Sequence, residues 1–288
     1  MKIGVVHFGS FSMGATQIVR SLIEGISKDT HRLFGVEYNR QTNEIEIKEL
    51  HKDSILTSKE TGNALLKSFP DQVWKDLQHH EALSQLDSII VLGGQEHQLS
   101  NQLVSSLHVP LSIFNNVEGS LFTLGYDTAV NSITNDIEKI RDTASSLYYK
   151  KLRVFNVQIP GEKSTPLLWN TALAVHAAVV TSADEQGIES VKQVIREKEA
   201  NGDTYCFIMM DRSVDPSVFE EPITREFDVD WKVAIYDESQ CVGPFPTALD
   251  KIFTIKMIDK ILKWVETIPQ TGKLVIVDNQ VEFQSLNQ

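Results

Sequence analysis

The N-terminal segment changes from a continuous apolar run to a helical spacing of apolar positions. Residues 2–8 (KIGVVHF) are mostly apolar and are followed by Gly9 and Gly14. Beyond these glycines, apolar side chains recur every three or four residues, at Ile18, Val19, Leu22, Ile23 and Ile26. A short apolar run bounded by glycine is typical of a buried strand, and the wider spacing is typical of an amphipathic helix. The pattern predicts a strand, a turn and a helix.

Two further short apolar runs follow in the first half of the chain. Residues 88–92 (SIIVL) lead into Gly93 and Gly94, and residues 109–114 (VPLSIF) form another apolar run. Strands that alternate with helices pair in parallel, because each helix carries the chain back to the start of the next strand. The sequence therefore predicts a parallel α/β architecture.

A long amphipathic helix is predicted over residues 128–146. Its apolar positions step by three or four residues (Val130, Ile133, Ile137, Ile140 and Ala144), which places them on one helix face. The next segment, residues 152–159, returns to the pattern of a strand. We interpret this helix as the beginning of a second lobe.

The second half of the chain contains another set of helical and strand patterns. We predict an alanine-rich helix at 170–180, a polar helix at 189–199 and a strand at 205–210, followed by an acidic, proline-containing loop. Residues 248–265 read as a helix, and residues 273–283 as a hairpin that turns at Asp278 and Asn279. The set indicates a second α/β lobe.

Composition and charge narrow the class of protein. A chain of 288 residues that is 41% hydrophobic is large enough for one large or two smaller domains. The net charge of -12 disfavours nucleic acids and anionic membranes as partners. No run approaches the roughly 20 apolar residues of a membrane span, and no signal peptide is evident, so we expect a cytoplasmic protein. Cys206 and Cys241 are expected to be buried free thiols, and no structural zinc is implied.

The glycine segments are the first candidate ligand sites. The segment from Gly9 to Gly14 is not followed by the Lys and Ser/Thr of a Walker loop. The two glycines therefore either bind a phosphate at the start of the helix or only allow the chain to turn. Gly93 and Gly94 lie at the carboxyl end of a predicted strand, where open α/β sheets bind ligands. The residues that follow are ambiguous: Gln95 is a poor Mg²⁺ ligand, and Glu96 with His97 fit a solvated helix start equally well.

His79 and His80 are neighbours on a predicted helix and point apart, which favours surface positions over a metal site.

One segment carries a specific resemblance. Residues 125–131 (GYDTAVN) and 137–146 (IEKIRDTASS) resemble the corresponding helix of bacterial ATP-dependent 6-phosphofructokinases. Weaker similarities follow in the family's order: the first glycine turn, residues 54–58 (SILTS), Gly93 with Gly94 as part of the GGDGS loop, and residues 272–275 (GKLV). The resemblance covers nearly the whole chain.

The resemblance implies a fold and a division into lobes. It implies two Rossmann-like lobes with parallel sheets flanked by helices, with ATP and Mg²⁺ on the larger lobe, fructose 6-phosphate between the lobes, and a homotetramer. We expect residues 1–125 plus 241–268 to form the larger, nucleotide-side lobe. Residues 126–240 plus 269–288 are then expected to form the smaller, sugar-phosphate-side lobe.

The departures from the family fall on its catalytic carboxylates. Gln95 stands where the GGDGS aspartate supports Mg²⁺. The family's TIDND motif corresponds to residues 112–116 (SIFNN), so Phe114 replaces the aspartate that acts as general base and Asn116 replaces the second aspartate. The arginine of the MGR motif is absent from residues 159–162 (IPGE), and residues 238–243 (ESQCVG) replace the GHxQRGG phosphate clamp. The strand that helps to form the family's effector pocket is missing between 180 and 189.

These departures predict a catalytically inactive relative of the phosphofructokinases that acts as a binding or regulatory protein or as a subunit partner. The alternative is an ATP-dependent 6-phosphofructokinase with a rearranged site, in which Glu96 or Glu118 takes over for a lost carboxylate. A different reaction would need new groups such as His97 and Glu162. The candidate cleft residues are Gly9, Gly14, Gly93, Gly94, Glu96, His97, Ser112, Glu118 and Asp211. Mg²⁺ and ATP are expected as cofactors only under the alternative.

A self-associating protein is also expected, as a homodimer or a homotetramer. Residues 147–149 (LYY) place large side chains directly after the long helix, where the family has a polar segment that reaches toward a neighbouring subunit. Exposed aromatic residues there would form an unusual apolar patch on a monomer. The alternative is that both tyrosines fold back onto their own lobe. An active phosphofructokinase and a small phosphorylated ligand are further candidate partners.

Overall fold

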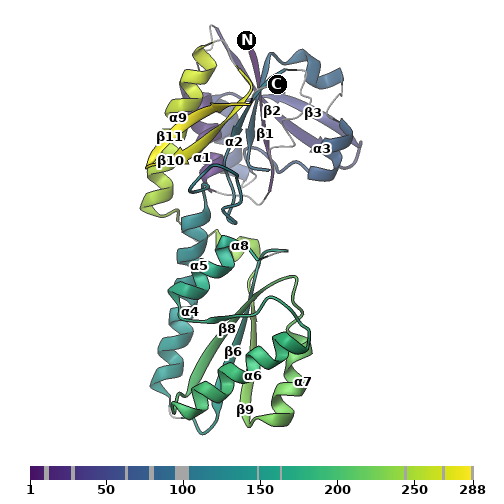
Figure 1. Cartoon of the computed structure of the whole chain (residues 1–288). Helices are drawn as coiled ribbons and strands as arrows, with labels where there is room; N and C mark the ends of the chain where they lie inside the picture. The colour runs from purple at the N-terminus through teal and green to yellow at the C-terminus, as the bar shows by residue number, and fades with distance from the viewer. Residues whose placement is uncertain are drawn as a thin grey trace. The chain divides into compact units, whose positions relative to one another are not determined.

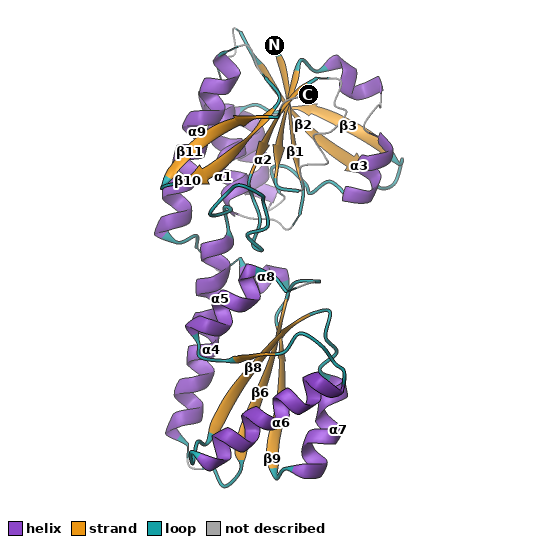
Figure 2. Ribbon diagram, in the orientation of Figure 1, coloured by secondary structure: helices purple, strands orange, loops and turns teal. Residues whose placement is uncertain are grey.

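The computed structural model describes residues 1–9, 13–26, 30–61, 64–77, 81–94, 104–147, 149–162, 164–242, 245–267 and 270–286. The chain divides into two compact units, each with its own sheet and core. Unit 1 comprises Met1–Asp127 and Pro244–Gln288, and unit 2 comprises Thr128–Gly243. The ribbon shows helices packed along the sheet in each unit (Figure 2). The prediction of an α/β fold is confirmed.

In its described residues, unit 1 is built on a seven-stranded sheet in the order β11-β10-β5-β4-β1-β2-β3. The five inner strands run parallel, and β3 and β11 pair antiparallel at the two edges. The strands are β1 (Lys2–His7), β2 (Arg32–Asn39), β3 (Glu44–Glu49), β4 (Ser88–Leu92), β5 (Ser105–Val109), β10 (Gly272–Val277) and β11 (Gln280–Ser285). The helices are α1 (Met13–Gly25), α2 (Lys52–Thr61), α3 (Asp71–Leu77), the 3₁₀ turn η1 (Glu81–Gln85) and α9 (Ala248–Glu266) (Figure 1).

Alternating side chains along the strands of unit 1 build two cores. Helices α1 and α9 pack beside each other, and their apolar faces share one core with Val5, Ile90 and Leu107. The intervening residues of the same strands point to the other face, where Phe8 and Phe69 meet Trp74 edge to face, each with ring centroids 5.2 Å from the tryptophan. A parallel sheet buried on both faces explains why its strands read as continuous apolar runs.

The part of unit 2 that the structure describes is built on a sheet of four parallel strands in the order β7-β8-β6-β9. Its strands are β6 (Leu152–Ile159), β7 (Ala178–Val179), β8 (Tyr205–Asp211) and β9 (Val229–Ile235). Its helices are α4 (Tyr126–Ser146), which starts at the end of unit 1, α5 (Pro166–Ala174), α6 (Glu185–Ala200), α7 (Ser217–Glu226) and α8 (Glu238–Cys241). Helices α6 and α7 cover a core that contains Val154, Ile195 and Phe219.

Several predicted elements are confirmed with their boundaries. The predicted strands at 88–92 and 152–159 coincide with β4 and β6, and the predicted helix at 128–146 coincides with α4 apart from its first turn. Asp278 and Asn279 both have positive φ (46° and 61°), as a two-residue type I′ hairpin turn requires. Cys206 and Cys241 are free and buried, and burial raises the pKa of each thiol to about 12.

Two predicted boundaries are wrong. The strand predicted at 109–114 is β5 (Ser105–Val109), which ends where Pro110 supplies no N–H for the ladder. After it, Leu111 makes only an isolated bridge to Leu124. The helix predicted at 170–180 is α5 (Pro166–Ala174), because His176 takes a positive φ of 54° and the chain then forms β7.

Other differences concern the acidic stretch and the C-terminal hairpin. The segment predicted as a loop after β8 forms α7, which includes Pro222, and then β9. Residues 269–288 were expected in the smaller lobe, whereas β10 pairs in parallel with β5 and carries β11 into the sheet of unit 1. The physical reason is that β5 would otherwise be left as an open edge of the unit 1 sheet.

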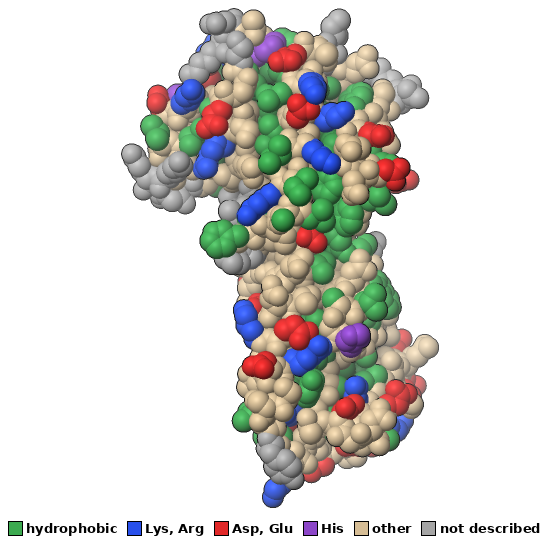
Figure 3. Space-filling model, turned by 90° about the vertical axis from the view of Figure 1, so that its left-hand side faces the viewer, with side chains coloured by type: hydrophobic (Ala, Val, Ile, Leu, Met, Phe, Trp, Pro, Cys, Tyr) green, Lys and Arg blue, Asp and Glu red, His purple; other side chains and the backbone are tan. Residues whose placement is uncertain are grey.

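The surface carries charges of both signs. On the visible face of unit 1, Lys and Arg side chains lie scattered among acidic and apolar ones (Figure 3). None of the helices in the described ranges is both long enough and apolar enough to cross a bilayer.

Candidate functional site

Three neighbouring strands of unit 1 end in polar or glycine-containing turns at the same edge of the sheet. Strands β1, β4 and β5 are parallel neighbours. Their carboxyl ends therefore bring together Gly9, the Gly93-Gly94 turn and the loop at residues 112–116. This carboxyl edge of unit 1 is the part of an open α/β sheet where ligands bind. Gly14, another candidate residue, lies at the start of α1.

Gly93 occupies a position that only glycine can take. Its φ is +73°, and a Cβ atom there would lie 2.7 Å from the carbonyl oxygen of Phe8 and 2.9 Å from that of Leu111. Gly94 also has a positive φ of 76°. Gly9 has a φ of +82°, but a Cβ atom there would meet nothing within 4 Å. Gly93 thus allows three backbone segments to lie close together, which explains why a glycine follows β4.

A buried histidine lies beneath the Gly93-Gly94 turn. His108 comes from β5, and its Nε2 atom lies 3.1 Å from the carbonyl oxygen of Gly93 and 3.3 Å from that of Gly94. At the neighbouring turn, the hydroxyl of Ser68 donates to the carbonyl of Gly9 at 2.8 Å. Neither side chain is among the candidates predicted from sequence, because neither belongs to a motif.

Hydrogen bonds within the loop at residues 112–116, and to Leu121 and Thr123, hold several of its polar groups. The Ser112 hydroxyl donates to Asn116 Oδ1 at 2.8 Å and accepts from the N–H of Phe114 at 3.1 Å. The Thr123 hydroxyl donates to the carbonyl of Ser112 at 2.6 Å. Asn115 takes a positive φ of 52° and donates to the carbonyl of Leu121 at 3.0 Å. Residues 112–116 contain no carboxylate, and their middle residue in the sequence, Phe114, is half-buried.

Glu118 follows this loop as an exposed side chain. Its backbone carbonyl accepts a hydrogen bond from Lys273 Nζ at 3.0 Å. Lys273 lies on β10 and is buried, so its ammonium group holds the backbone at Glu118.

Asp211 belongs to unit 2. It ends β8 as a buried residue, and its Oδ1 atom accepts hydrogen bonds from the N–H of Ser213 at 2.9 Å and from the Ser213 hydroxyl. The carboxylate therefore stabilises the turn after β8. The remaining candidates Gln95, Glu96 and His97, together with His79 and His80, lie outside the described residues.

A groove of about 550 Å³ lies beside this turn in unit 2. It is lined by Gln158, Arg212, Ser213, Asp215, Pro216, Ser217, Glu220, Val233 and Ile235. The N–H and hydroxyl of Ser217 hold the pKa of Asp215 below its usual value. Because Arg212 is accompanied by Asp215 and Glu220, the lining has no excess of positive charge. Across the described parts of the chain, no three His, Cys, Asp or Glu side chains are grouped as metal ligands.

Comparison with known proteins assigns the chain to a family. The phosphofructokinase family model matches residues 2–265. The chain belongs to the phosphofructokinase family. Among its relatives, the ATP-dependent 6-phosphofructokinase of Shouchella clausii is 24% identical over 270 residues, which cover 89% of this chain and 83% of the relative. The enzyme of the same name from Brevibacillus brevis is 25% identical with the same coverage.

Solved phosphofructokinase structures share the fold. Phosphofructokinase from Pichia pastoris superimposes with a TM-score of 0.73 at 15% identity, over 99% of this chain and 37% of the Pichia chain. The pyrophosphate-dependent phosphofructokinase of Marinobacter aquaeolei gives a TM-score of 0.72 at 12% identity, over 98% of this chain and 81% of that protein. The expectation of a phosphofructokinase-like α/β fold is confirmed.

Proposed function

We propose that this chain is a phosphofructokinase-family protein without ordinary phosphofructokinase turnover, and that it acts as a binding or regulatory protein or as the subunit partner of an active enzyme. The observation that carries the proposal is the loop at residues 112–116. There the Ser112 hydroxyl donates to Asn116, and Phe114, which lies between these two residues in the sequence, has a side chain that cannot accept a proton.

Phosphoryl transfer to a sugar hydroxyl depends on positioning, on charge stabilisation and on a group that accepts the hydroxyl proton. Loss of a general base alone typically lowers a rate by about 10² to 10⁴. The resemblance also implies that Gln95 replaces a carboxylate that supports the metal ion. That replacement removes further charge stabilisation from the transition state. Losses within one catalytic unit do not add simply, but both lower the rate, so we expect no ordinary flux through the reaction.

A coupled assay tests this proposal. Purified protein with fructose 6-phosphate and Mg²⁺ is offered ATP in one arm and pyrophosphate in the other, since relatives and structural neighbours carry names with either donor. We expect no rate above a protein-free blank with either donor. The related enzyme of Shouchella clausii, assayed in parallel, shows that the coupling system works.

The alternative is an active kinase with a rearranged site. A robust rate that disappears in Glu96→Ala or Glu118→Ala would establish this alternative and refute the proposal. Glu24→Ala is the matched control, because Glu24 is an exposed glutamate near the end of α1, outside the candidate residues. A rate lost only in the first two variants identifies the replacement carboxylate.

A further inference from the structure

The groove between α7 and β9 of unit 2 has an aliphatic wall. Val233 and Ile235 lie two residues apart on β9, so their side chains project from the same face of the sheet. Both line the groove, and they are 44% and 58% exposed. Pro216 adds apolar surface at the start of α7. A concave site of about 550 Å³ with such a wall fits a small ligand that has an apolar body.

Gln158 presents a hydrogen-bond acceptor to this groove. It lies on β6 in register with Ile235. Its Nε2 atom donates to the carbonyl of Val214 at 2.7 Å and lies 3.5 Å from the carbonyl of Asp211. Carbonyl oxygens only accept hydrogen bonds, so the amide nitrogen is the atom that faces them. Gln158 is only 8% exposed, and its Oε1 atom accepts from no group among the described residues. This nearly buried oxygen is left for a donor that enters the groove.

Two carboxylates of the groove lack a cationic partner. Asp215 and Glu220 line the groove at the start of α7, and neither takes part in an ion pair with another described residue. Hydrogen bonds from Ser217 hold the pKa of Asp215 below its usual value, so this side chain is ionised at neutral pH. Arg212 donates instead to the carbonyl of Tyr236 at 3.3 Å. One arginine and two carboxylates leave the groove with an excess of negative charge, which favours a cation.

We propose that the groove between α7 and β9 binds a small organic amine in its protonated form. The ammonium group is held by Asp215, Glu220 and Oε1 of Gln158, and the aliphatic chain lies on Val233 and Ile235. An ammonium group has three donors and no acceptor, which matches oxygen atoms that are free to accept. A bare divalent cation would leave the aliphatic wall unused. This site goes beyond the proposed function and holds whether or not the chain transfers phosphate.

Titration of the whole chain with n-pentylamine, followed in ¹H–¹⁵N NMR spectra at pH 7, tests the proposal. NaCl at about 0.15 M screens the general attraction of cations to a protein with a net charge of -12. We expect a Kd of about 1 to 10 mM, with shifts of the Ser217, Val233 and Ile235 amide signals. Propylamine lacks two methylene groups and should bind about tenfold more weakly. Pentanoate, which carries the opposite charge on a similar chain, should not bind.

Four variants at exposed positions, which are expected to fold, locate the site. Glu220→Gln and Asp215→Asn each remove a charge at nearly constant size and should weaken pentylamine binding by about fivefold. Ile235→Thr makes the wall polar and should weaken binding by about threefold. Glu221→Gln is the matched control, because it removes the same charge from the next residue of α7. The Glu221 carboxylate pairs with Arg225 and does not line the groove, so binding should be unchanged.

Several results would overturn the proposal. These are no shift of the groove amides at about 20 mM pentylamine, equal binding of pentanoate, and equal weakening in Glu220→Gln and Glu221→Gln, which would indicate attraction to overall charge alone. Binding of Nα-acetyl-lysine N-methylamide about tenfold more tightly than pentylamine would also overturn it, because the groove would then recognise a lysine side chain in a peptide. None of these titrations measures phosphoryl transfer, so their failure is distinguishable from a rate in the coupled assay.

Discussion

Single residues at the carboxyl edge of unit 1 differ sharply in how much change they tolerate. Gly93→Ala places a methyl group against the carbonyls of Phe8 and Leu111 in a left-handed conformation. We expect this substitution to lower the free energy of unfolding by about 3 kcal/mol or more. Gly9→Ala meets no atom within 4 Å and carries only the conformational cost, about 1 kcal/mol. Urea unfolding followed by circular dichroism measures both.

The two glycine variants form a matched pair. Equal losses of stability in Gly93→Ala and Gly9→Ala would show that the close approach at Gly93 contributes nothing beyond its backbone conformation.

The glycine turns and His108 show what the sequence can and cannot predict about the site. The glycine turns were predictable, because glycine takes a positive φ more readily than any other residue. His108 was not predictable, because no local spacing reveals that its ring reaches a turn 15 residues earlier in the chain.

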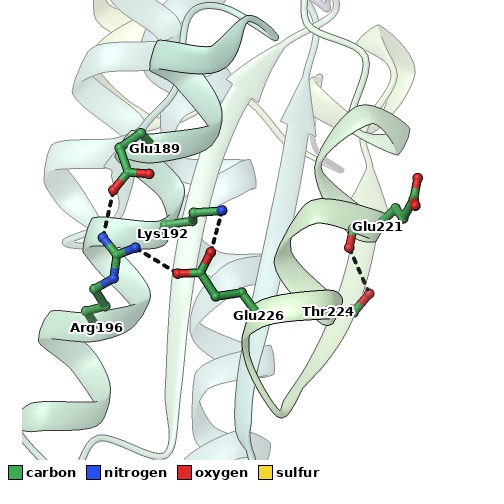
Figure 4. Close-up of polar contacts among 6 residues, drawn as sticks. All are labelled: Glu189, Lys192, Arg196, Glu221, Thr224 and Glu226. Carbon is green, nitrogen blue, oxygen red and sulfur yellow. Dashed lines mark hydrogen bonds and ion pairs between the residues drawn. The ribbon is translucent and has the colours of Figure 1, made fainter.

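Helices α6 and α7 are joined by a network of ion pairs. Arg196 donates to Glu189 Oε1 at 2.7 Å and to Glu226 Oε1 at 2.8 Å, and Lys192 pairs with the other carboxylate oxygen of Glu226 (Figure 4). Hydrogen bonds from Lys192 and then from Arg196 lower the pKa of Glu226. A carboxylate with a lowered pKa stabilises the fold above its unfolded pKa, and this stabilisation is lost as the pH falls through the lowered value.

We therefore expect Glu226→Gln to have a lower urea midpoint than the parent at pH 7, and the difference to disappear at a pH well below 4.5, the usual pKa of this side chain. Glu221→Gln is the matched control on the same helix, since its ion pair with Arg225 is largely exposed and such pairs contribute little. Chemical denaturation at a series of pH values checks this. A midpoint difference that persists unchanged at low pH would contradict the assignment.

At the scale of helices and strands, burial determines which elements the sequence pattern predicts. The strands β4 and β6 are buried on both faces and read as apolar runs, and α4 keeps a regular apolar stripe. Helix α7 buries only Phe219 and Ile223 and contains Pro222, so its composition resembles a loop. Strand β9 lies at the edge of its sheet with several exposed side chains, which hides its alternation. Tertiary packing, rather than local preference, forms these two elements.

At the scale of the whole molecule, we expect the chain to assemble with copies of itself. Leu147 is 54% exposed and Tyr149 is 44% exposed, although the guanidinium of Arg153 lies over the Tyr149 ring, 5.1 Å from its centroid. We propose that the exposed side chains of Leu147 and Tyr149 contribute to the interface of a homo-oligomer. We expect a closed assembly, because two-fold symmetry is the commonest among soluble homo-oligomers. Light scattering after size exclusion should give the mass of two or four chains of 32.4 kDa each.

A matched pair of surface variants locates the interface. Leu147→Lys should shift the mass toward a single chain, whereas Leu56→Lys, at a residue of similar exposure in unit 1 (57%), should leave it unchanged. The mass of one chain for the parent protein at micromolar concentration would refute the expectation of a homo-oligomer.

The position of β10 has a consequence for how the protein forms during synthesis. Unit 2 is continuous in sequence and interrupts unit 1, and Gly272 of β10 pairs with Leu107 of β5, 165 residues earlier. A ribosome therefore releases all of unit 2 before the strand that completes the sheet of unit 1 has been made. Because domains fold as units while the chain emerges, unit 2 folds before the sheet of unit 1 is complete. Until β10 is synthesised, β5 is an unpaired edge strand that a chaperone or a second nascent chain can reach.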